Sequence, residues 1–230
     1  MVKKLSLKLL SLLPEFIFKR VVNVLFSNKE EKELTFEEIV SDCEIIKVKL
    51  FESESDLFIQ NLKKCDLYGE YGSGISTIYA VNYLNKQSIS VDTDNEWVKK
   101  INNSVFNKSK LNIEHVNLGK ISSFGRPENY EYRNEIKDYL NYIWNQDRKP
   151  NFVLIDGRFR VACFLSTLIY AEKETIICFD DYILRPHYHI VEYFEKPIKK
   201  NKRQAFFKVN KNYSQSEIEY YLNKFEFVME

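Results

Sequence analysis

Short apolar runs alternate with amphipathic stretches from residue 65 onward. The apolar runs have the length of buried strands, and the stretches between them repeat their apolar positions at helical spacing. We expect strands ending near residue 70 and over residues 88–91, 113–116, 152–155 and 175–179, with helices over residues 75–84, 95–102, 133–144 and 160–170. Strands that alternate with helices form βαβ units, so the pattern predicts an α/β domain with a mostly parallel sheet.

Two further strand-like segments, near residues 195–199 and 204–209, are close enough in the chain to form a hairpin. Such a hairpin would give the sheet an antiparallel terminal strand. Capping boxes, in which Ser or Thr is followed three positions later by Glu, predict where helices begin. The chain has three of them, at Thr35…Glu38, Thr93…Glu96 and Ser214…Glu217.

Residues 1–34 are expected to form an N-terminal amphipathic helical segment, followed by the main domain over residues 35–230. Lysines and large apolar side chains share this segment, and Pro14 is expected to interrupt its helix. The apolar run is too short to span a bilayer, and no small-residue cleavage pattern follows it. Two interpretations remain for residues 3–26: packing on the main domain, or contact with a membrane surface or a partner.

The composition is that of an ordinary globular protein, with 44% hydrophobic and 29% charged residues among 230. The net charge of +1 gives no general attraction to nucleic acid, so we expect no nucleic-acid partner. The four cysteines lack the spacing of a zinc site, and most of them lie in apolar stretches. This usage favours reduced core thiols and a cytoplasmic location.

A glycine-containing loop follows the strand expected near residue 70, and it reads Gly69-Glu70-Tyr71-Gly72-Ser73-Gly74-Ile75-Ser76-Thr77. Glycines at such a place let the backbone approach a ligand, and the next helix offers free N–H groups. Asp92 ends the following strand, about twenty positions past Gly72, where a carboxylate can accept hydrogen bonds from both ribose hydroxyls. Gly72, Ser73, Gly74 and Asp92 are therefore candidate ligands of NAD or of S-adenosylmethionine.

Glu70 distinguishes between these two cofactors. A carboxylate there would repel a pyrophosphate, whereas it suits a ligand that carries an ammonium and a sulfonium group. Residues 70–74 and 90–94 resemble motif I and the following acidic motif of class I S-adenosylmethionine-dependent methyltransferases. The resemblance implies a Rossmann-like, doubly wound sheet, with Glu70 near the methionine amino group and Asp92 on the ribose. Ser76 departs from the family pattern, which has glycine at that position.

Two later strands also end in carboxylates, because Asp156 follows residues 152–155 and Asp180 and Asp181 follow residues 175–179. The carboxyl ends of parallel strands meet at the ligand-binding edge of an open α/β sheet. Three carboxylates that converge there repel one another unless positive charge lies between them, and a divalent cation such as Mg²⁺ would provide it. The alternative is that the aspartates only hydrogen-bond to their own loops.

The aspartate arrangement is similar to that of metal-dependent O-methyltransferases of the macrocin and catechol types, at the level of pattern over residues 65–209. The resemblance implies that Asp156, Asp180 and Asp181 are metal ligands, and it adds Asp156 to the catalytic set and Asp181 to the acceptor-binding set. The catechol type carries a lysine three positions after its first metal aspartate, and here that position is Phe159. A lysine base is therefore not expected.

Three basic features lie near this edge. His187 follows the aspartate pair and is assigned as general base, with an ordinary surface histidine as the alternative. Arg158 is assigned to an anionic group of the acceptor, whereas Arg160 is equally consistent with a helix start that faces water. The basic run over residues 196–203 is interpreted as a solvated hairpin turn, with contact to an anionic polymer or phospholipid as the alternative.

These features predict an S-adenosylmethionine-dependent methyltransferase that methylates a hydroxyl of a glycan or small molecule, with Mg²⁺ assisting. Two alternatives remain: a metal-independent methyltransferase for a small acid or amine, and a non-catalytic Rossmann-like binding subunit. A dehydrogenase is disfavoured because Glu70 and the paired aspartates have no task in it. The sequence identifies neither the acceptor nor the oligomeric state, because acceptor pockets are built from variable loops.

Overall fold

The computed structural model describes residues 50, 51 and 55–229. The sheet and the helices below belong to the unit Asp56–Glu230. Four expectations lie outside the described residues: the N-terminal helical segment, the boundary between residues 34 and 35, the cap at Thr35, and the state of Cys43.

A seven-stranded sheet forms the centre of this unit, with the strand order β3-β2-β1-β4-β5-β7-β6. Its strands are β1 (Leu67–Tyr71), β2 (Gln87–Asp92), β3 (Leu111–His115), β4 (Phe152–Ile155), β5 (Ile176–Phe179), β6 (Lys199–Lys200) and β7 (Ala205–Lys208). β1 to β5 pair in parallel, while β7 runs antiparallel to both β5 and β6. The predicted mostly parallel sheet with an antiparallel terminal strand is confirmed.

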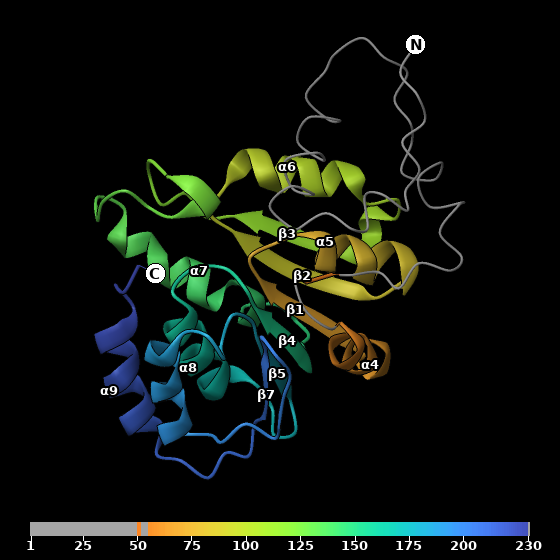
Figure 1. The fold of residues 1–230 in the computed structure, drawn as a ribbon. Helices are drawn as coiled ribbons and strands as arrows, with labels where there is room; N and C mark the ends of the chain where they lie inside the picture. Colours follow the sequence, from red (N-terminus) through yellow and green to blue (C-terminus); the bar gives the residue numbers. More distant parts are fainter. Residues whose placement is uncertain (1–49, 52–54, 230) are drawn as a thin grey trace, which may run out of the picture. The chain divides into compact units, whose positions relative to one another are not determined.

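Helices cover both faces of the sheet (Figure 1). One face carries α4 (Asp56–Lys64), α5 (Ile75–Ile78) continuing into the π-helical turn η1 (Tyr79–Tyr83), and α6 (Asn95–Ser104). The other carries α7 (Ile136–Asn141), α8 (Arg160–Tyr170) and α9 (Gln215–Phe225). Short 3-10 turns lie between them, at η2 (Lys108–Lys110), η3 (Ser123–Gly125), η4 (Arg133–Glu135), η5 (Tyr142–Trp144) and η6 (Pro186–Tyr193).

All five residues of β1 are buried, because helices cover both of its faces. Successive side chains of a strand point to opposite faces, so β1 feeds two cores. Leu67 and Tyr71 belong to the core beneath α7 and α8, whereas Tyr68 packs its ring against Phe58 of α4. Glu70 shares the face of Tyr68, so the alternation places a carboxylate inside the protein, next to α5.

Most expected helices and strands recur with small shifts at their ends. The strand expected near residues 195–199 is reduced to β6, the helix expected over residues 133–144 is α-helical only in α7, and one capping residue is wrong. α6 begins after Asp94, whose carboxylate accepts from the backbone N–H of Trp97 at 3.1 Å. Thr93 was expected in that role, but its hydroxyl donates to the carbonyl of Gly125 at 2.6 Å. The cap at Ser214 is confirmed, since its hydroxyl accepts from the N–H of Glu217.

Two further expectations concern bulk properties. Cys65, Cys163 and Cys178 are buried free thiols, as the sequence predicts. Over the part of the chain that the structure describes, every helix is too short or too polar to cross a bilayer.

Candidate functional site

The glycine loop, residues 72–74, leaves the carboxyl end of β1 and is tied to its neighbours by several hydrogen bonds. The N–H of Gly72 donates to a backbone carbonyl of β2 at 2.9 Å. The N–H and the hydroxyl of Ser73 both donate to Oδ2 of Asp92, at 2.8 and 3.0 Å. The carbonyl of Ser73 accepts from Nε1 of Trp97 at 2.7 Å. The loop is therefore fixed to β2 and α6.

The two glycines of this loop have different surroundings. Gly72 has φ +88, and a Cβ there would lie 2.6 Å from the Cα of Gly157 in the loop after β4. Only glycine fits, both for its backbone angle and for this close approach. Gly74 is extended, and the nearest atom to a Cβ there would be Oγ of Ser76 at 3.8 Å. Gly72 thus packs two loops against each other, whereas a side chain at Gly74 would make only an ordinary contact with Ser76.

The carboxylate of Asp92 accepts four hydrogen bonds from the loops around it. Its Oδ1 accepts from the N–H groups of Thr93 and Asp94 at 2.7 and 3.1 Å, and its Oδ2 accepts twice from Ser73. Burial raises the pKa of Asp92, and the N–H of Asp94 together with the donors of Ser73 works against that shift. A carboxylate has about four lone-pair positions, so a ligand hydroxyl reaches Asp92 only by replacing the Ser73 hydroxyl, the one donor that can rotate away.

Glu70 is expected beside the cofactor's amino group, and that role stays a prediction. Its side chain is fully buried and accepts hydrogen bonds from the hydroxyls of Tyr68, Ser76 and Thr77. Burial raises the pKa of Glu70 to about 7, although these three hydrogen bonds oppose the shift. The carboxylate is directed beneath the glycine loop, and the geometry gives no support to direct contact with a ligand on its outer side.

The loop between β3 and α7 crosses the same edge of the sheet. The carbonyl of Gly125 accepts from Thr93, which follows β2, and the carbonyl of Phe124 accepts from Nε of Arg158, which follows β4, at 2.8 Å. A Cβ on Gly125 would lie 3.7 Å from Oδ1 of Asp92. This segment thus lies beside Asp92, and Phe124 itself is 73% exposed.

The three aspartates predicted as metal ligands do come together at the ends of β4 and β5. Asp156, Asp180 and Asp181 each offer an oxygen within 4.8 Å of the others. Asp180 is fully buried, while the other two are partly exposed. Sequence reasoning was therefore right that the fold gathers these carboxylates and that positive charge must lie among them.

Arginine side chains supply positive charge to this cluster. Arg160, only 4% exposed, forms ion pairs with Asp156 at 3.0 Å and with Asp181 at 3.3 Å. Arg203 reaches both Asp180 and Asp181 with Nη2 at 2.7 Å. Burial alone would lower the pKa of either arginine, but the surrounding carboxylates outweigh it and raise the pKa above its ordinary value. Both guanidinium groups are therefore charged.

A metal ion fits this arrangement poorly. Arg185 adds a further ion pair to Asp181 at 2.9 Å, so three carboxylates face three guanidinium groups. The oxygens of Asp180 also accept from Gln204 Nε2 and Arg203 Nε, at 2.9 and 2.8 Å. A divalent cation would have to displace these donors and would add charge to a cluster that is already neutral. The Mg²⁺ site stays a prediction of the sequence, and the donor set does not favour it.

The two remaining predicted residues, His187 and Arg158, contact different residues. His187 is exposed in η6, where its ring packs on Tyr188, and within the described residues no hydrogen bond joins it to the aspartates. Arg158 is partly exposed and holds the β3–α7 loop through Phe124. The roles of His187 as base and Arg158 as acceptor ligand stay predictions.

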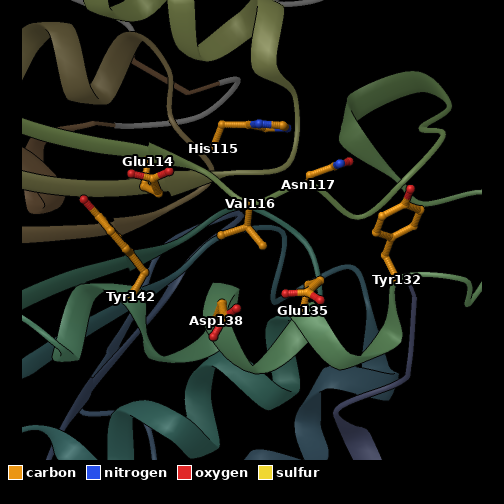
Figure 2. A pocket seen from close by; sticks show the side chains of 8 residues that line it. All are labelled: Glu114, His115, Val116, Asn117, Tyr132, Glu135, Asp138 and Tyr142. Carbon is orange, nitrogen blue, oxygen red and sulfur yellow. The ribbon is translucent and has the colours of Figure 1, made fainter.

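Figure 2 shows a cavity of about 420 Å³ beside the end of β3. It is lined by Glu114, His115, Val116, Asn117, Tyr132, Glu135, Asp138 and Tyr142. His115 is the register partner of Asp92, so the cavity begins one strand away from Asp92 and two strands away from the glycine loop. Its lining includes none of the predicted site residues.

Several residues that build the site escaped sequence reasoning. Trp97 and Gly157 hold the glycine loop from positions far along the chain, and no local pattern signals such contacts. Arg203 belongs to the basic run interpreted as a solvated turn, yet its side chain is 16% exposed and ion-paired. Arg160 is buried rather than facing water. The available hint that buried cations are needed was that carboxylates directly follow two apolar strands, at Asp156 and at Asp180 and Asp181.

Comparisons with known proteins show which solved structures share this fold. The sequence matches neither a protein-family model nor a curated protein. Among solved structures, a methyltransferase-like protein from Silicibacter pomeroyi DSS-3 has 26% sequence identity and a TM-score of 0.66, covering 79% of this chain and 96% of that one. An RNA methyltransferase from Salinibacter ruber, solved with S-adenosyl-L-homocysteine, has 9% identity and a TM-score of 0.43, covering 70% of this chain and 95% of that one. The chain therefore has the Rossmann-like α/β fold of the first of these proteins.

Proposed function

We propose that this protein is an S-adenosylmethionine-dependent methyltransferase. The observation that carries the proposal is the glycine loop after β1, bound through Ser73 to the carboxylate that ends β2. A Cβ at Gly74 would meet only Oγ of Ser76, at 3.8 Å, so the backbone at the start of α5 is not packed against a second loop as Gly72 is. The similarity to a methyltransferase-like protein over 79% of the chain supports the same reading.

In this proposal the cofactor lies across the carboxyl ends of β1 and β2. The ribose hydroxyls take the place of the Ser73 hydroxyl on Asp92, and the backbone at Gly72 and Gly74 borders the rest of the cofactor. Methyl transfer is a displacement in line with the breaking bond from sulfur, so the protein's main task is to place the acceptor atom opposite that bond. The β3–α7 loop borders the ribose in this proposal, because Gly125 lies close to Asp92.

The acceptor is proposed to be a hydroxyl on a glycan or small molecule, on the strength of the sequence resemblance alone. Of the metal-assisted and metal-independent versions, the arginine pairs favour the second. Three guanidinium groups already neutralise Asp156, Asp180 and Asp181. Arg158 follows β4 and is partly exposed, so its positive charge suits an acid or phosphate group on the acceptor.

Isothermal titration calorimetry with S-adenosylhomocysteine tests the proposal, with NAD⁺ as the matched control ligand. We expect binding of the first at micromolar concentration and none of the second. Absence of any heat with S-adenosylhomocysteine would instead favour the non-catalytic binding subunit. Binding of NAD⁺ would favour the dehydrogenase.

A further inference from the structure

A chain of hydrogen bonds runs from the glycine loop to a buried acid. The N–H of Gly74 donates to Oγ1 of Thr77 at 2.9 Å, and the Thr77 hydroxyl donates to Oε2 of Glu70. The hydroxyl of Ser76 donates to the other oxygen, Oε1. Glu70 has no exposed surface. A backbone amide of the loop is therefore connected to a carboxyl group inside the protein.

The groups facing Glu70 come from three elements. β1 contributes the phenol of Tyr68, which donates to Oε1 at 2.9 Å. β2 contributes Ser90, 3.5 Å from Oε2, and the charged group of Asp92. α5 contributes only the hydroxyls of Ser76 and Thr77. Within the described residues no basic side chain pairs with Glu70, so its charge is balanced by hydroxyl groups alone.

This setting makes both protonation states of Glu70 accessible near neutral pH, because burial raises its pKa to about 7. When Glu70 is ionised, every neighbouring hydroxyl donates to it. When it is protonated, one of its oxygens becomes a donor, and a hydroxyl must turn or lose its partner. A hydroxyl that donates to an anion is also a better acceptor, so the bond from Gly74 to Thr77 is strongest with Glu70 ionised.

We propose that Ser76 and Thr77 are positioning residues through which the protonation state of Glu70 sets the geometry of the glycine loop and the affinity for the cofactor. The effect on affinity rests on the proposed function, whereas the effect on the loop does not. Glu70 acts in this scheme from beneath the loop, without touching the cofactor. Ser76, which departs from the family pattern, is then one of the residues that link Glu70 to the loop.

The tryptophans provide a readout that needs no ligand. The protein has two: the indole of Trp97 donates to Ser73 of the loop, whereas that of Trp144 is buried and donates to the hydroxyl of Tyr71. Full-length protein labelled with 5-fluorotryptophan gives one ¹⁹F signal for each, and Trp97→Phe assigns them. We expect the Trp97 signal to shift in one step near pH 7, while the Trp144 signal stays constant.

Variants test whether the hydrogen bonds from Glu70 through Ser76 and Thr77 carry the effect, or whether any buried acid would produce it. Glu70→Gln removes the titration, and Ser76→Ala and Thr77→Val each remove one hydroxyl without adding bulk. We expect the step in the Trp97 signal to vanish in Glu70→Gln, to weaken in the two hydroxyl variants, and to return in Thr77→Ser. A Trp97 signal that does not respond to pH in the unmodified protein, or that responds equally in Glu70→Gln, would overturn the proposal.

Calorimetry with S-adenosylhomocysteine adds the functional readout. A hydrogen bond to a charged group exceeds a neutral one by about 1 kcal/mol, which corresponds to roughly fivefold in affinity. We therefore expect roughly fivefold tighter binding at about pH 8 than at about pH 6, and no such difference in Glu70→Gln or Thr77→Val. A pH-dependent shift of the Trp97 signal without binding of S-adenosylhomocysteine would refute the methyltransferase proposal, while the proposed effect of Glu70 on the loop would stand. Binding of S-adenosylhomocysteine with the same affinity at both pH values would refute the proposed effect of Glu70 on affinity, while the methyltransferase proposal would stand.

Discussion

A side chain at Gly72 would need the space that Gly157 occupies, since a Cβ there would lie 2.6 Å from both the Cα and the N of Gly157. The loops after β1 and β4 therefore close against each other through two residues without side chains. Tyr139 from α7 confines Gly157 from the other side, and its hydroxyl accepts from the N–H of Arg158 at 3.2 Å. The glycine loop owes its position to this contact as much as to its own sequence.

Gly72→Ala should destabilise the protein and abolish cofactor binding. The methyl group meets the backbone of Gly157, and φ +88 is strained for alanine, so we expect a loss of about 1–3 kcal/mol in the free energy of unfolding. Gly74→Ala is the matched control, because its Cβ would make only an ordinary contact and its backbone is extended. Chemical denaturation of the two variants checks this, and equal midpoints would contradict the close packing.

Asp92→Asn should weaken binding of S-adenosylhomocysteine at least tenfold, an estimate of about 1.4 kcal/mol for a lost charge-assisted hydrogen bond. The amide NH₂ group cannot accept from Ser73 or from the backbone, so the loop also loses a tether. Asp94→Asn is the control, because asparagine caps a helix as well as aspartate does. Calorimetry on both variants should show the loss at position 92 alone.

Arg203→Leu should cost about 3–5 kcal/mol of stability, because it leaves the fully buried Asp180 without its cation. The double variant Arg203→Leu with Asp180→Asn should recover part of that loss. Lys196→Leu provides a comparison just before the same hairpin, since the Lys196 side chain is exposed and its ion pair with Glu192 spans 3.7 Å. Urea denaturation measures all three, and similar losses for Arg203 and Lys196 would show that the cluster is not stabilised by buried charge.

Divalent cations should have little effect on the protein. The guanidinium groups of Arg160 and Arg203 already lie on the oxygens that a metal would use. We expect the thermal midpoint to be unchanged by Mg²⁺ or EDTA, and Mn²⁺ titration followed by electron paramagnetic resonance to show only free ion. Tight Mn²⁺ binding that is lost in Asp181→Asn would support the metal site that the sequence predicts.

Glu70 should make stability depend on pH in a defined direction. Its pKa is about 7 in the folded protein and 4.5 ordinarily, so the folded state binds more protons between these values. Its contribution is therefore fully present below about pH 4.5 and is lost as the pH rises through 7, by roughly 3 kcal/mol in all. Denaturation of the unmodified protein and of Glu70→Gln across this range should show the difference. Parallel pH profiles would contradict it.

The sequence predicted the sheet well because apolar runs and amphipathic stretches are local signals. The strand over residues 152–155 and the helix over residues 160–170 match the structure residue for residue. The antiparallel terminal strand also followed from local spacing, since β6 and β7 form the expected hairpin. The apolar runs and the helical spacing that predict such elements can be read within a few residues of the chain.

The sequence allowed the clustered carboxylates of the site to be predicted, but not the arginines that pair with them. Asp156, Asp180 and Asp181 each follow a buried strand, so topology alone gathers them. The cations come from α8, from the residue before η6 and from the turn of the hairpin. Nothing local shows that Arg203 turns inward while its neighbour Lys202 stays exposed. Thr93 failed as a cap for a similar reason, because Gly125, far along the chain, accepts from its hydroxyl. Contacts between distant residues decided each of these cases.

The contact between Gly72 and Gly157 also has a consequence for synthesis on the ribosome. Chains emerge from the amino terminus onward, and long-range contacts form only when both partners exist. β1, β2 and the glycine loop are made early, but the backbone that confines the loop follows β4. A nascent chain that stops before Gly157 therefore holds an unfinished loop, and the ligand site is completed only when the second half of the sheet joins the first.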